Sequence, residues 1–300
     1  MNKDYLNDAL ALHPKVVRSR RDFLRTSAYA GGLMGFATAA QPVMGQQLVT
    51  TDFKGIKAGE KSIDLGSEAL YAYVAEPEKK DGKLPIIIVV SEIFGVHEHI
   101  ADIARRFAKL GYMAIAPEFF TRAGDPTTLG TVAEIMSEIV SKTPDKQVMS
   151  DMSAALKWAG ENGGDPSRVG VTGFCWGGRI TWLACANLPQ VKAGVAWYGR
   201  LVGEKSDNFP AHPVDLAQSL KAPVLGLYGG KDTGIPLDTV EQMKQALYKA
   251  SSNPSAAKSQ FVIYPDAPHA FHADYRATYQ EGPAKNGWDQ CIKWFKQNGV

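Results

Sequence analysis

The chain has 300 residues, 45% of them hydrophobic, which is enough for one large core or two modest ones. Residues 1–40 hold six of the 33 basic and three of the 31 acidic side chains, so the formal net charge of +2 becomes −1 without them, which argues against a protein that binds nucleic acid or a membrane surface. Three widely spaced cysteines, an odd number, argue against a disulfide framework or a zinc module.

Residues 1–40 show the order of features found in a twin-arginine signal peptide. The adjacent Arg20 and Arg21 precede an apolar, Gly- and Ala-rich run over residues 28–37, and small residues then predict cleavage near Ala39–Ala40. The run is too short for a stable membrane span, and an N-terminal amphipathic helix is the less favoured alternative. We therefore expect the twin-arginine export machinery to carry the folded chain to the periplasm.

Residues 41–61 are expected to form a polar connector, and residues 62–300 a single domain. The domain is expected to begin with an antiparallel hairpin, because alternating segments at 62–65 and 69–75 flank a Gly-Ser pair. The continuous β-branched run that follows Pro85 predicts a central parallel strand that is buried on both faces.

Strands and helices alternate from there to the end of the chain. Apolar residues at helical spacing, glycines after helix ends and a proline near a helix start mark the helices. The predicted strands after the hairpin span residues 85–90, 113–116, 168–172, 191–198, 223–228 and 260–264, and the predicted helices span 100–110, 131–142, 144–162, 179–186, 237–249 and 283–297. Repeated βα units predict an α/β fold, with a doubly wound, mostly parallel sheet and helices on both faces.

Residues 173–178 (GFCWGG) join a predicted strand directly to a predicted helix. A Ser or Cys with Gly two positions before and after it, at a strand-to-helix turn, is typical of a nucleophile elbow. Glycine is needed there because the strand and helix close on each other around a strained central residue. Cys175 would then lie at a helix N-terminus, which favours its thiolate; the alternative is a small buried cysteine in a tight turn.

Two further candidate residues follow strands at their carboxyl ends, where reactive groups collect in open α/β sheets. Asp232 follows the strand at 223–228, and His269 follows the strand at 260–264. The order Cys175, Asp232, His269 is that of nucleophile, acid and base in α/β-hydrolases. His269 is predicted to transfer protons and Asp232 to hold its tautomer. Taken singly, Asp232 also fits a turn residue and His269 a loop histidine.

The loop after the strand at 85–90 supplies further candidates. In an α/β-hydrolase this loop lends one oxyanion-hole N–H and the residue after the nucleophile lends the other, which predicts Ile93 and Trp176. Glu92 is predicted to face the same pocket as the thiol, and the alternative is a solvated loop glutamate.

Four segments together resemble the dienelactone hydrolase (carboxymethylenebutenolidase) family across residues 62–300: EIFG at 92–95, GFCWGG at 173–178, GGKD at 229–232 and PHAF at 268–271. The resemblance implies an α/β-hydrolase fold and a cysteine that stays largely protonated until substrate binding reorients it. It implies that Cys175 is the nucleophile, that Glu92 accepts the thiol proton, and that His269 and Asp232 assist acyl transfer.

The same resemblance implies two arginines that bind a substrate carboxylate. Arg122 fits the first, since a guanidinium forks onto both carboxylate oxygens. The second position is Ala273 in this chain, and Arg276 is the candidate replacement. Ala270 stands where the family has a serine, so the identity of the ester remains open. Tyr198 is predicted either to line the pocket or to belong to the core.

No metal and no cofactor are predicted. His97 and His99 resemble half a metal site, but no second cluster accompanies them, so a solvated loop is predicted there. His272 is expected on a pocket wall or at the surface and is given no role. Cys185 and Cys291 are predicted to pack in the core.

The predicted function is hydrolysis of an activated, carboxylate-bearing ester or lactone through an acyl-cysteine intermediate. A periplasmic thiol redox or sensor protein that uses Cys175 is an alternative, although the sequence contains no C-x-x-C motif and no obvious resolving cysteine. A non-catalytic binding protein on a hydrolase scaffold is a second alternative, and the intact Cys, Asp and His set disfavours it.

Overall fold

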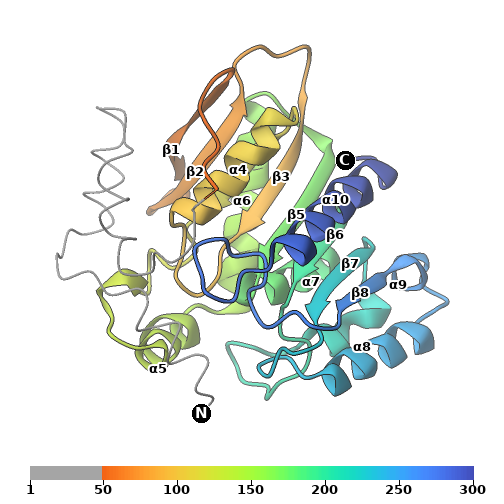
Figure 1. The fold of residues 1–300 in the computed structure, drawn as a ribbon. Helices are drawn as coiled ribbons and strands as arrows, with labels where there is room; N and C mark the ends of the chain where they lie inside the picture. The colour runs from red at the N-terminus through yellow and green to blue at the C-terminus, as the bar shows by residue number, and fades with distance from the viewer. Residues whose placement is uncertain (1–48) are drawn as a thin grey trace.

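The computed structural model describes residues 49–300, so the predicted signal peptide and the first part of the predicted connector lie outside the described residues. The described residues contain an eight-stranded sheet with the order β1-β2-β4-β3-β5-β6-β7-β8 (Figure 1). The strands are β1 (Ile56–Asp64), β2 (Ala69–Pro77), β3 (Leu84–Val90), β4 (Met113–Pro117), β5 (Gly164–Phe174), β6 (Val191–Trp197), β7 (Val224–Gly229) and β8 (Gln260–Tyr264). β2 pairs antiparallel with β1 and β4, and the remaining neighbours pair parallel, which confirms the mostly parallel sheet with an antiparallel start.

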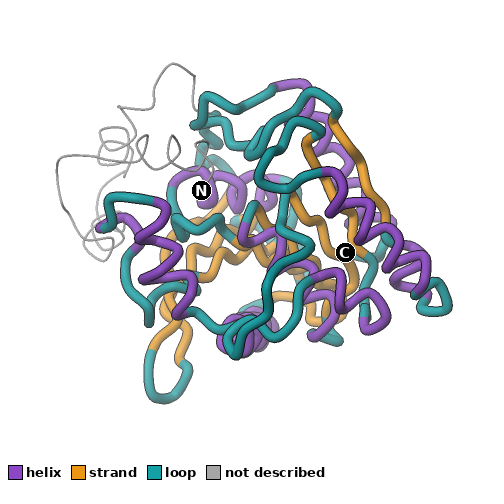
Figure 2. Tube along the Cα trace, turned by 90° about the horizontal axis from the view of Figure 1, so that it is seen from below, coloured by secondary structure: helices purple, strands orange, loops and turns teal. Residues whose placement is uncertain are grey.

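Helices cover both faces of this sheet (Figures 1 and 2). The longer helices are α4 (Glu98–Lys109), α6 (Asp145–Glu161), α7 (Trp176–Asn187), α8 (Leu237–Lys249) and α10 (Glu281–Gln297). The short helical segments are η2 (Pro126–Thr128), α5 (Val132–Glu134), η3 (Ile135–Ile139), η4 (Val140–Lys142), η5 (Pro213–Ser219) and α9 (Pro254–Lys258). Within the described chain, no helix combines the length and the apolar character that a membrane crossing requires.

Two apolar cores lie on opposite faces of the sheet. Strand β3 contributes to both, because alternate side chains of a strand point to opposite faces. Ile86 and Ile88 pack with residues of α6, α7 and α8, whereas Ile87 and Val89 pack with residues of α4 and α10. The continuous apolar run at 85–90 follows from this double burial, which confirms the doubly wound arrangement.

Some boundaries differ from the predictions. β1 begins at Ile56, inside the predicted connector. The sequence did not indicate this start, because only Ile56 and Ile63 of this edge strand are buried and its apolar alternation is weak. The helix predicted over 131–142 is a continuous helical stretch that contains a π-helical segment, η3. Pro144 precedes α6 as its N-cap and not as its first residue. α9 and η5 were not predicted, because five and seven residues are too few for a periodic pattern.

The strand ends place four candidate residues at one edge of the sheet. Glu92 follows β3, Cys175 follows β5, Asp232 follows β7 and His269 follows β8. These four strands run parallel, so their carboxyl ends meet on the same side, where open α/β sheets carry their ligands.

Candidate active site

Cys175 occupies a strained turn between β5 and α7. Its backbone has φ 54° and ψ −112°, a conformation that L-residues rarely adopt. The Cys175 N–H donates to the Trp197 carbonyl, and the Gly178 N–H donates to the Cys175 carbonyl, both at 3.0 Å. A Cβ atom on Gly177 would lie 2.3 Å from the Val90 carbonyl oxygen, so only glycine allows α7 to approach β3 this closely. The predicted strand–turn–helix geometry is thus confirmed.

The structure brings His269 and Asp232 together with Cys175. His269 Nδ1 lies 2.7 Å from Asp232 Oδ2, and the imidazole also hydrogen-bonds Cys175. The Asp232 side chain is fully buried, and its Oδ1 accepts the N–H groups of Gly234 and Ile235, each at 2.9 Å. Burial lowers the pKa of His269, but the charges and hydrogen bonds of Cys175 and Asp232 outweigh burial and raise that pKa to about 10. The imidazole therefore lies between two acidic groups that favour its protonated form.

Glu92 is buried in the loop after β3, so it is not the solvated glutamate of the alternative interpretation. Its Oε2 lies 3.1 Å from His97 Nε2, and its buried Oε1 has no hydrogen-bond partner among the described residues. Burial raises the pKa of Glu92, but the hydrogen bond and charge of His97, with the charges of His99 and Arg276, hold that pKa at about 2. At neutral pH Glu92 is therefore a buried anion.

Ile93 and Trp176, the predicted oxyanion-hole residues, lie on two segments in close contact. Trp176 is the first residue of α7, where an amide N–H has no acceptor within its own helix. A Cβ atom on Gly177 would lie 2.6 Å from the Ser91 carbonyl oxygen, so the start of α7 presses against the loop that carries Ile93. The assignment of their N–H groups to an oxyanion stays a prediction.

Tyr198 lies at the site as well as in the core. Its ring meets the ring of His269 edge-on, with centroids 5.1 Å apart, and its buried hydroxyl has no hydrogen-bond partner within residues 49–300. Burial, together with the charges of Glu92 and Tyr275, raises the pKa of this hydroxyl well above its ordinary value. Among described non-glycine residues, positive φ angles occur at Cys175, Tyr198 and Ala270, all of which adjoin His269.

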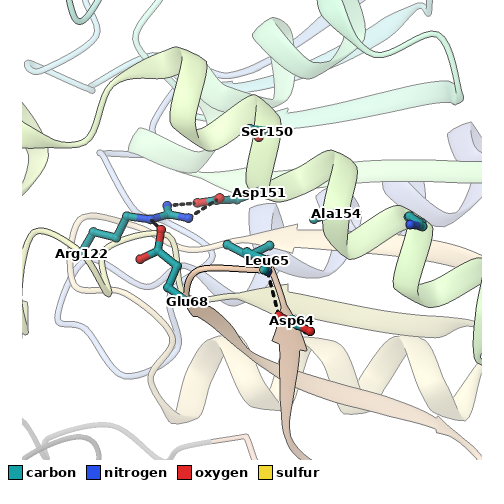
Figure 3. Close-up of a pocket in the computed structure, with 9 residues that line it drawn as sticks. Asp64, Leu65, Glu68, Arg122, Ser150, Asp151 and Ala154 are labelled. Carbon is teal, nitrogen blue, oxygen red and sulfur yellow. Dashed lines mark hydrogen bonds and ion pairs between the residues drawn. The ribbon is translucent and has the colours of Figure 1, made fainter.

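Arg122 makes its hydrogen bonds with two protein carboxylates, and its predicted role in binding a substrate carboxylate stays a prediction. Its Nη1 and Nη2 donate to the two oxygens of Asp151 on α6, at 2.7 and 2.9 Å, and its Nε pairs with Glu68 in the β1–β2 turn (Figure 3). Two protein carboxylates therefore occupy the guanidinium. The cavity beside it, of about 560 Å³, is lined by Asp64, Leu65, Gly66, Glu68, Arg122, Ser150, Asp151, Ala154 and Lys157, and by none of the residues that cluster with Cys175.

Arg276, in contrast, lies beside Glu92. Its guanidinium carbon is 5.0 Å from the centre of the Phe94 ring, and its Nε donates to the Tyr275 hydroxyl at 3.1 Å. Its positive charge contributes to the lowered pKa of Glu92. Ala273, the position of the second arginine in the family resemblance, is fully buried in the apolar core.

The surroundings of Glu92 include residues that the sequence did not predict for the site. The predicted solvated loop at 97–99 is wrong, because α4 begins directly after His97 and turns His99 into the interior. His99 Nδ1 lies 3.0 Å from Asp274 Oδ1, and Asp274 Oδ2 accepts from Arg106 Nη2 at 2.7 Å. Both histidines closely precede the amphipathic helix predicted at 100–110, and this position was the available signal for the burial of His99.

The remaining candidates pack in the interior. Cys185 and Cys291 are fully buried, as predicted, and burial raises the pKa of both thiols. His272 is buried against Trp197, with ring centroids 4.4 Å apart, and burial lowers its pKa well below the ordinary value. In residues 49–300, no group of three His, Cys, Asp or Glu side chains is arranged to hold a metal ion.

Comparison with known proteins gives a consistent result. A sequence model of the dienelactone hydrolase family matches residues 70–299. The chain is 52% identical, over 294 residues that cover 98% of each chain, to a Methylorubrum extorquens protein provisionally named carboxymethylenebutenolidase. A Salmonella typhimurium protein with the same provisional name is 54% identical, over 88% of this chain and 96% of that relative.

A solved structure gives the same picture. The crystal structure of a protein from Klebsiella pneumoniae, provisionally described as a dienelactone hydrolase, superposes with a TM-score of 0.78 at 57% identity. The match covers 81% of this chain and 99% of the other. The α/β-hydrolase fold predicted from the strand and helix order is therefore confirmed.

Proposed function

Because the chain belongs to the dienelactone hydrolase family, we propose that it hydrolyses an activated ester or lactone through an acyl-cysteine intermediate on Cys175. The main support is the contact between Cys175 and His269, with Asp232 Oδ2 2.7 Å from the other side of the imidazole. Acyl transfer uses this arrangement, in which a base contacts the nucleophile and a buried acid orients the base.

In the proposed first half-reaction, Glu92 accepts the thiol proton of Cys175 and the thiolate adds to the substrate carbonyl. The N–H groups of Ile93 and Trp176 bind the resulting oxyanion. When the tetrahedral intermediate collapses, the C–O bond breaks, the proton held by Glu92 passes to the leaving oxygen, and a thioester remains on Cys175.

In the second half-reaction, water adds to the thioester carbonyl while His269 accepts its proton. Collapse breaks the C–S bond, the proton returns from His269 to the sulfur, and the acid is released. In its thiolate form Cys175 contributes to the raised pKa of His269. The thioester sulfur of the acyl-enzyme carries no charge, so after acylation the imidazole is more readily neutral and basic when water must be activated.

Substrates that carry a carboxylate fit the site best in this proposal. Arg276 is the buried cation beside Glu92, and its Nε contacts Tyr275. A guanidinium binds a carboxylate by paired, charge-assisted hydrogen bonds. The Tyr198 hydroxyl, which has no hydrogen-bond partner among the described residues, would add a second polar group beside His269.

The test is hydrolysis of matched lactones, esters and thioesters, with and without a carboxylate, by the mature protein. Cys175→Ala is expected to lower kcat/KM by roughly 10³-fold or more, because the nucleophile is lost. Intact-mass spectrometry of the wild type during turnover should show an acyl adduct on Cys175. Unchanged turnover by Cys175→Ala would remove the nucleophile assignment, and binding without turnover would favour a non-catalytic role.

A redox or sensor function receives less support. The two other cysteines of the described chain, Cys185 and Cys291, are fully buried and unpaired, so neither is positioned as a resolving thiol. For location, we propose export to the periplasm through residues 1–40, on the evidence of the Arg20-Arg21 pair and the apolar run that follows it.

A further inference from the structure

We propose that His97 is a positioning residue for the thiol-activating base: it holds one carboxylate oxygen of Glu92 and leaves the other oxygen available to Cys175. The inference rests on the role proposed for Glu92 above. His97 lies outside the set of residues that the family resemblance predicted, and its contact with Glu92 is set by the fold of α4.

His97 is itself held in place from two sides. It is the N-cap of α4, and its carbonyl accepts the Ala101 N–H at 3.0 Å. Its ring meets the Tyr275 ring edge-on, with centroids 5.0 Å apart. The imidazole is therefore fixed between a helix and the loop that carries Arg276, and from there its Nε2 reaches Glu92 Oε2 at 3.1 Å.

The two oxygens of Glu92 have different surroundings. A buried carboxylate is stable when hydrogen bonds replace the lost water, and Oε2 has such a bond. Oε1 is buried without a partner among the described residues, as is the Tyr198 hydroxyl. The charges of Glu92 and Cys175 both raise the pKa of that hydroxyl, so the carboxylate and the thiol lie near the same group. Oε1 is thus the oxygen left to accept a proton.

His97 also decides whether Glu92 is able to act as a base. The ionisable groups around Glu92 include His97 before α4 and His99 within it, and Arg276 and His272 from the loop after β8. Tyr198, directly after β6, adjoins both Glu92 and the Cys175 thiol that Glu92 is proposed to deprotonate. Of the groups that lower the pKa of Glu92, His97 acts through both a hydrogen bond and its charge, whereas His99 and Arg276 act through charge alone. Without His97, burial would be opposed only by the charges of His99 and Arg276, so the pKa of Glu92 would rise. A protonated carboxyl is unable to accept the thiol proton.

The direct test is a carboxyl titration that needs no turnover. Protein labelled with ¹³C at the glutamate side-chain carboxyl is titrated from pH 8 to pH 4, and the Glu92 resonance is assigned by its loss in Glu92→Gln. In the wild type this resonance should stay at the shift of an ionised carboxylate. In His97→Leu it should move with a midpoint above pH 5, whereas His97→Asn, which keeps a hydrogen-bond donor, should restore much of the wild-type behaviour. His97→Ala replaces the leucine variant if leucine does not fit.

Kinetics supply the second readout. Relative to wild type, kcat/KM of His97→Leu should fall at least about twofold more at pH 5 than at pH 8, because at least half of Glu92 is protonated at the lower pH. In the Glu92→Gln background the same substitution should no longer alter the pH profile. His212→Asn is the matched control: His212 is another N-cap histidine, held by the Glu204 carbonyl at 2.8 Å, and its substitution should leave the Glu92 titration unchanged.

An unshifted Glu92 resonance in His97→Leu would overturn the inference, and so would a pH effect that persists in Glu92→Gln. Failure of the proposed function is recognised separately, because it would appear as hydrolysis that survives Cys175→Ala. The resonance of Glu92 reports its ionisation in either case.

Discussion

His269 shows how individual side chains divide the work at this site. One nitrogen faces a fully buried carboxylate, and the ring also contacts the thiol. Asp232 also stabilises its own turn, because its Oδ1 accepts hydrogen bonds from the N–H groups of Gly234 and Ile235. These bonds hold the Asp232 carboxylate in a fixed position relative to the His269 imidazole.

Asp232→Asn separates these two tasks. The amide retains an oxygen for the turn, but its NH₂ group faces His269 Nδ1 and favours the wrong tautomer, so kcat should fall by on the order of 10³–10⁴ while stability changes little. The measurements are steady-state kinetics and thermal unfolding. Asp232→Ala serves as a control, since it should also lower stability by about 1–2 kcal/mol through loss of the turn hydrogen bonds. Activity within tenfold of wild type in the asparagine variant would contradict the orienting role.

The positions of Cys175, Asp232, His269 and Glu92 were predictable because each lies directly after a strand or in the loop that follows it. The contact between Glu92 and His97 was not predictable, because it depends on which residue begins α4 and on the direction in which the His97 side chain then points. Arg122 was placed at the site by resemblance alone. Its hydrogen-bond partners, Glu68 and Asp151, lie far from Arg122 in the sequence, and no local sequence pattern indicates that these segments meet.

Among the helices and strands, the buried ones were the easiest to predict. The apolar run of β3 faces a core on each side, so its sequence fits few other structures. Edge strand β1 buries only two residues, and its start was predicted six residues too late. The sequence did not predict the contact between α4 and the loop after β8. It is made by Asp274, which bridges His99 and Arg106.

Asp274→Asn tests the strength of this contact. Burial raises the pKa of Asp274, but the charges and hydrogen bonds of His99 and Arg106 outweigh it and lower that pKa to about 2. A depressed carboxyl pKa stabilises the fold above the unfolded-state value near 4, and this contribution is lost as pH falls toward 2. The substitution should thus lower the free energy of unfolding by roughly 2 kcal/mol at pH 7, and the difference from wild type should shrink between pH 4 and pH 2.

Urea unfolding at a series of pH values measures this difference. Asp266→Asn is a suitable control, because Asp266 makes an exposed ion pair with Lys231 and should change stability little at any of these pH values. A difference between Asp274→Asn and wild type that does not vary with pH would show that the carboxylate charge is not the stabilising element.

The complete domain is tied to the segment that precedes its first strand. The Thr51 N–H donates to Asp102 on α4, and Arg105 Nε donates to the Thr51 carbonyl at 3.2 Å. The chain that leads from the proposed signal peptide is therefore attached to a helix that packs against the sheet. This attachment suits export after folding, which is how the twin-arginine route operates.

Replacing Arg20 and Arg21 together with lysine should block the proposed export. The full-length precursor should accumulate in the cytoplasm, whereas the unchanged chain should appear in the periplasm with an N-terminus near residue 40. Cell fractionation and N-terminal mass spectrometry check both expectations. Cys175→Ala is the control, since loss of the thiol should not affect export. Periplasmic recovery of the lysine variant at normal levels would contradict the twin-arginine assignment.

The positive φ angles of Cys175, Tyr198 and Ala270 carry a consequence for any attempt to engineer this domain. Backbone in such regions costs on the order of 1–3 kcal/mol per residue, and the two well-packed cores offset this cost. A selection for heat resistance alone would therefore favour glycine or asparagine at these positions. The most heat-resistant variants would be poor hydrolases, because the strained backbone that they had lost is what places the Cys175 sulfur against the His269 imidazole.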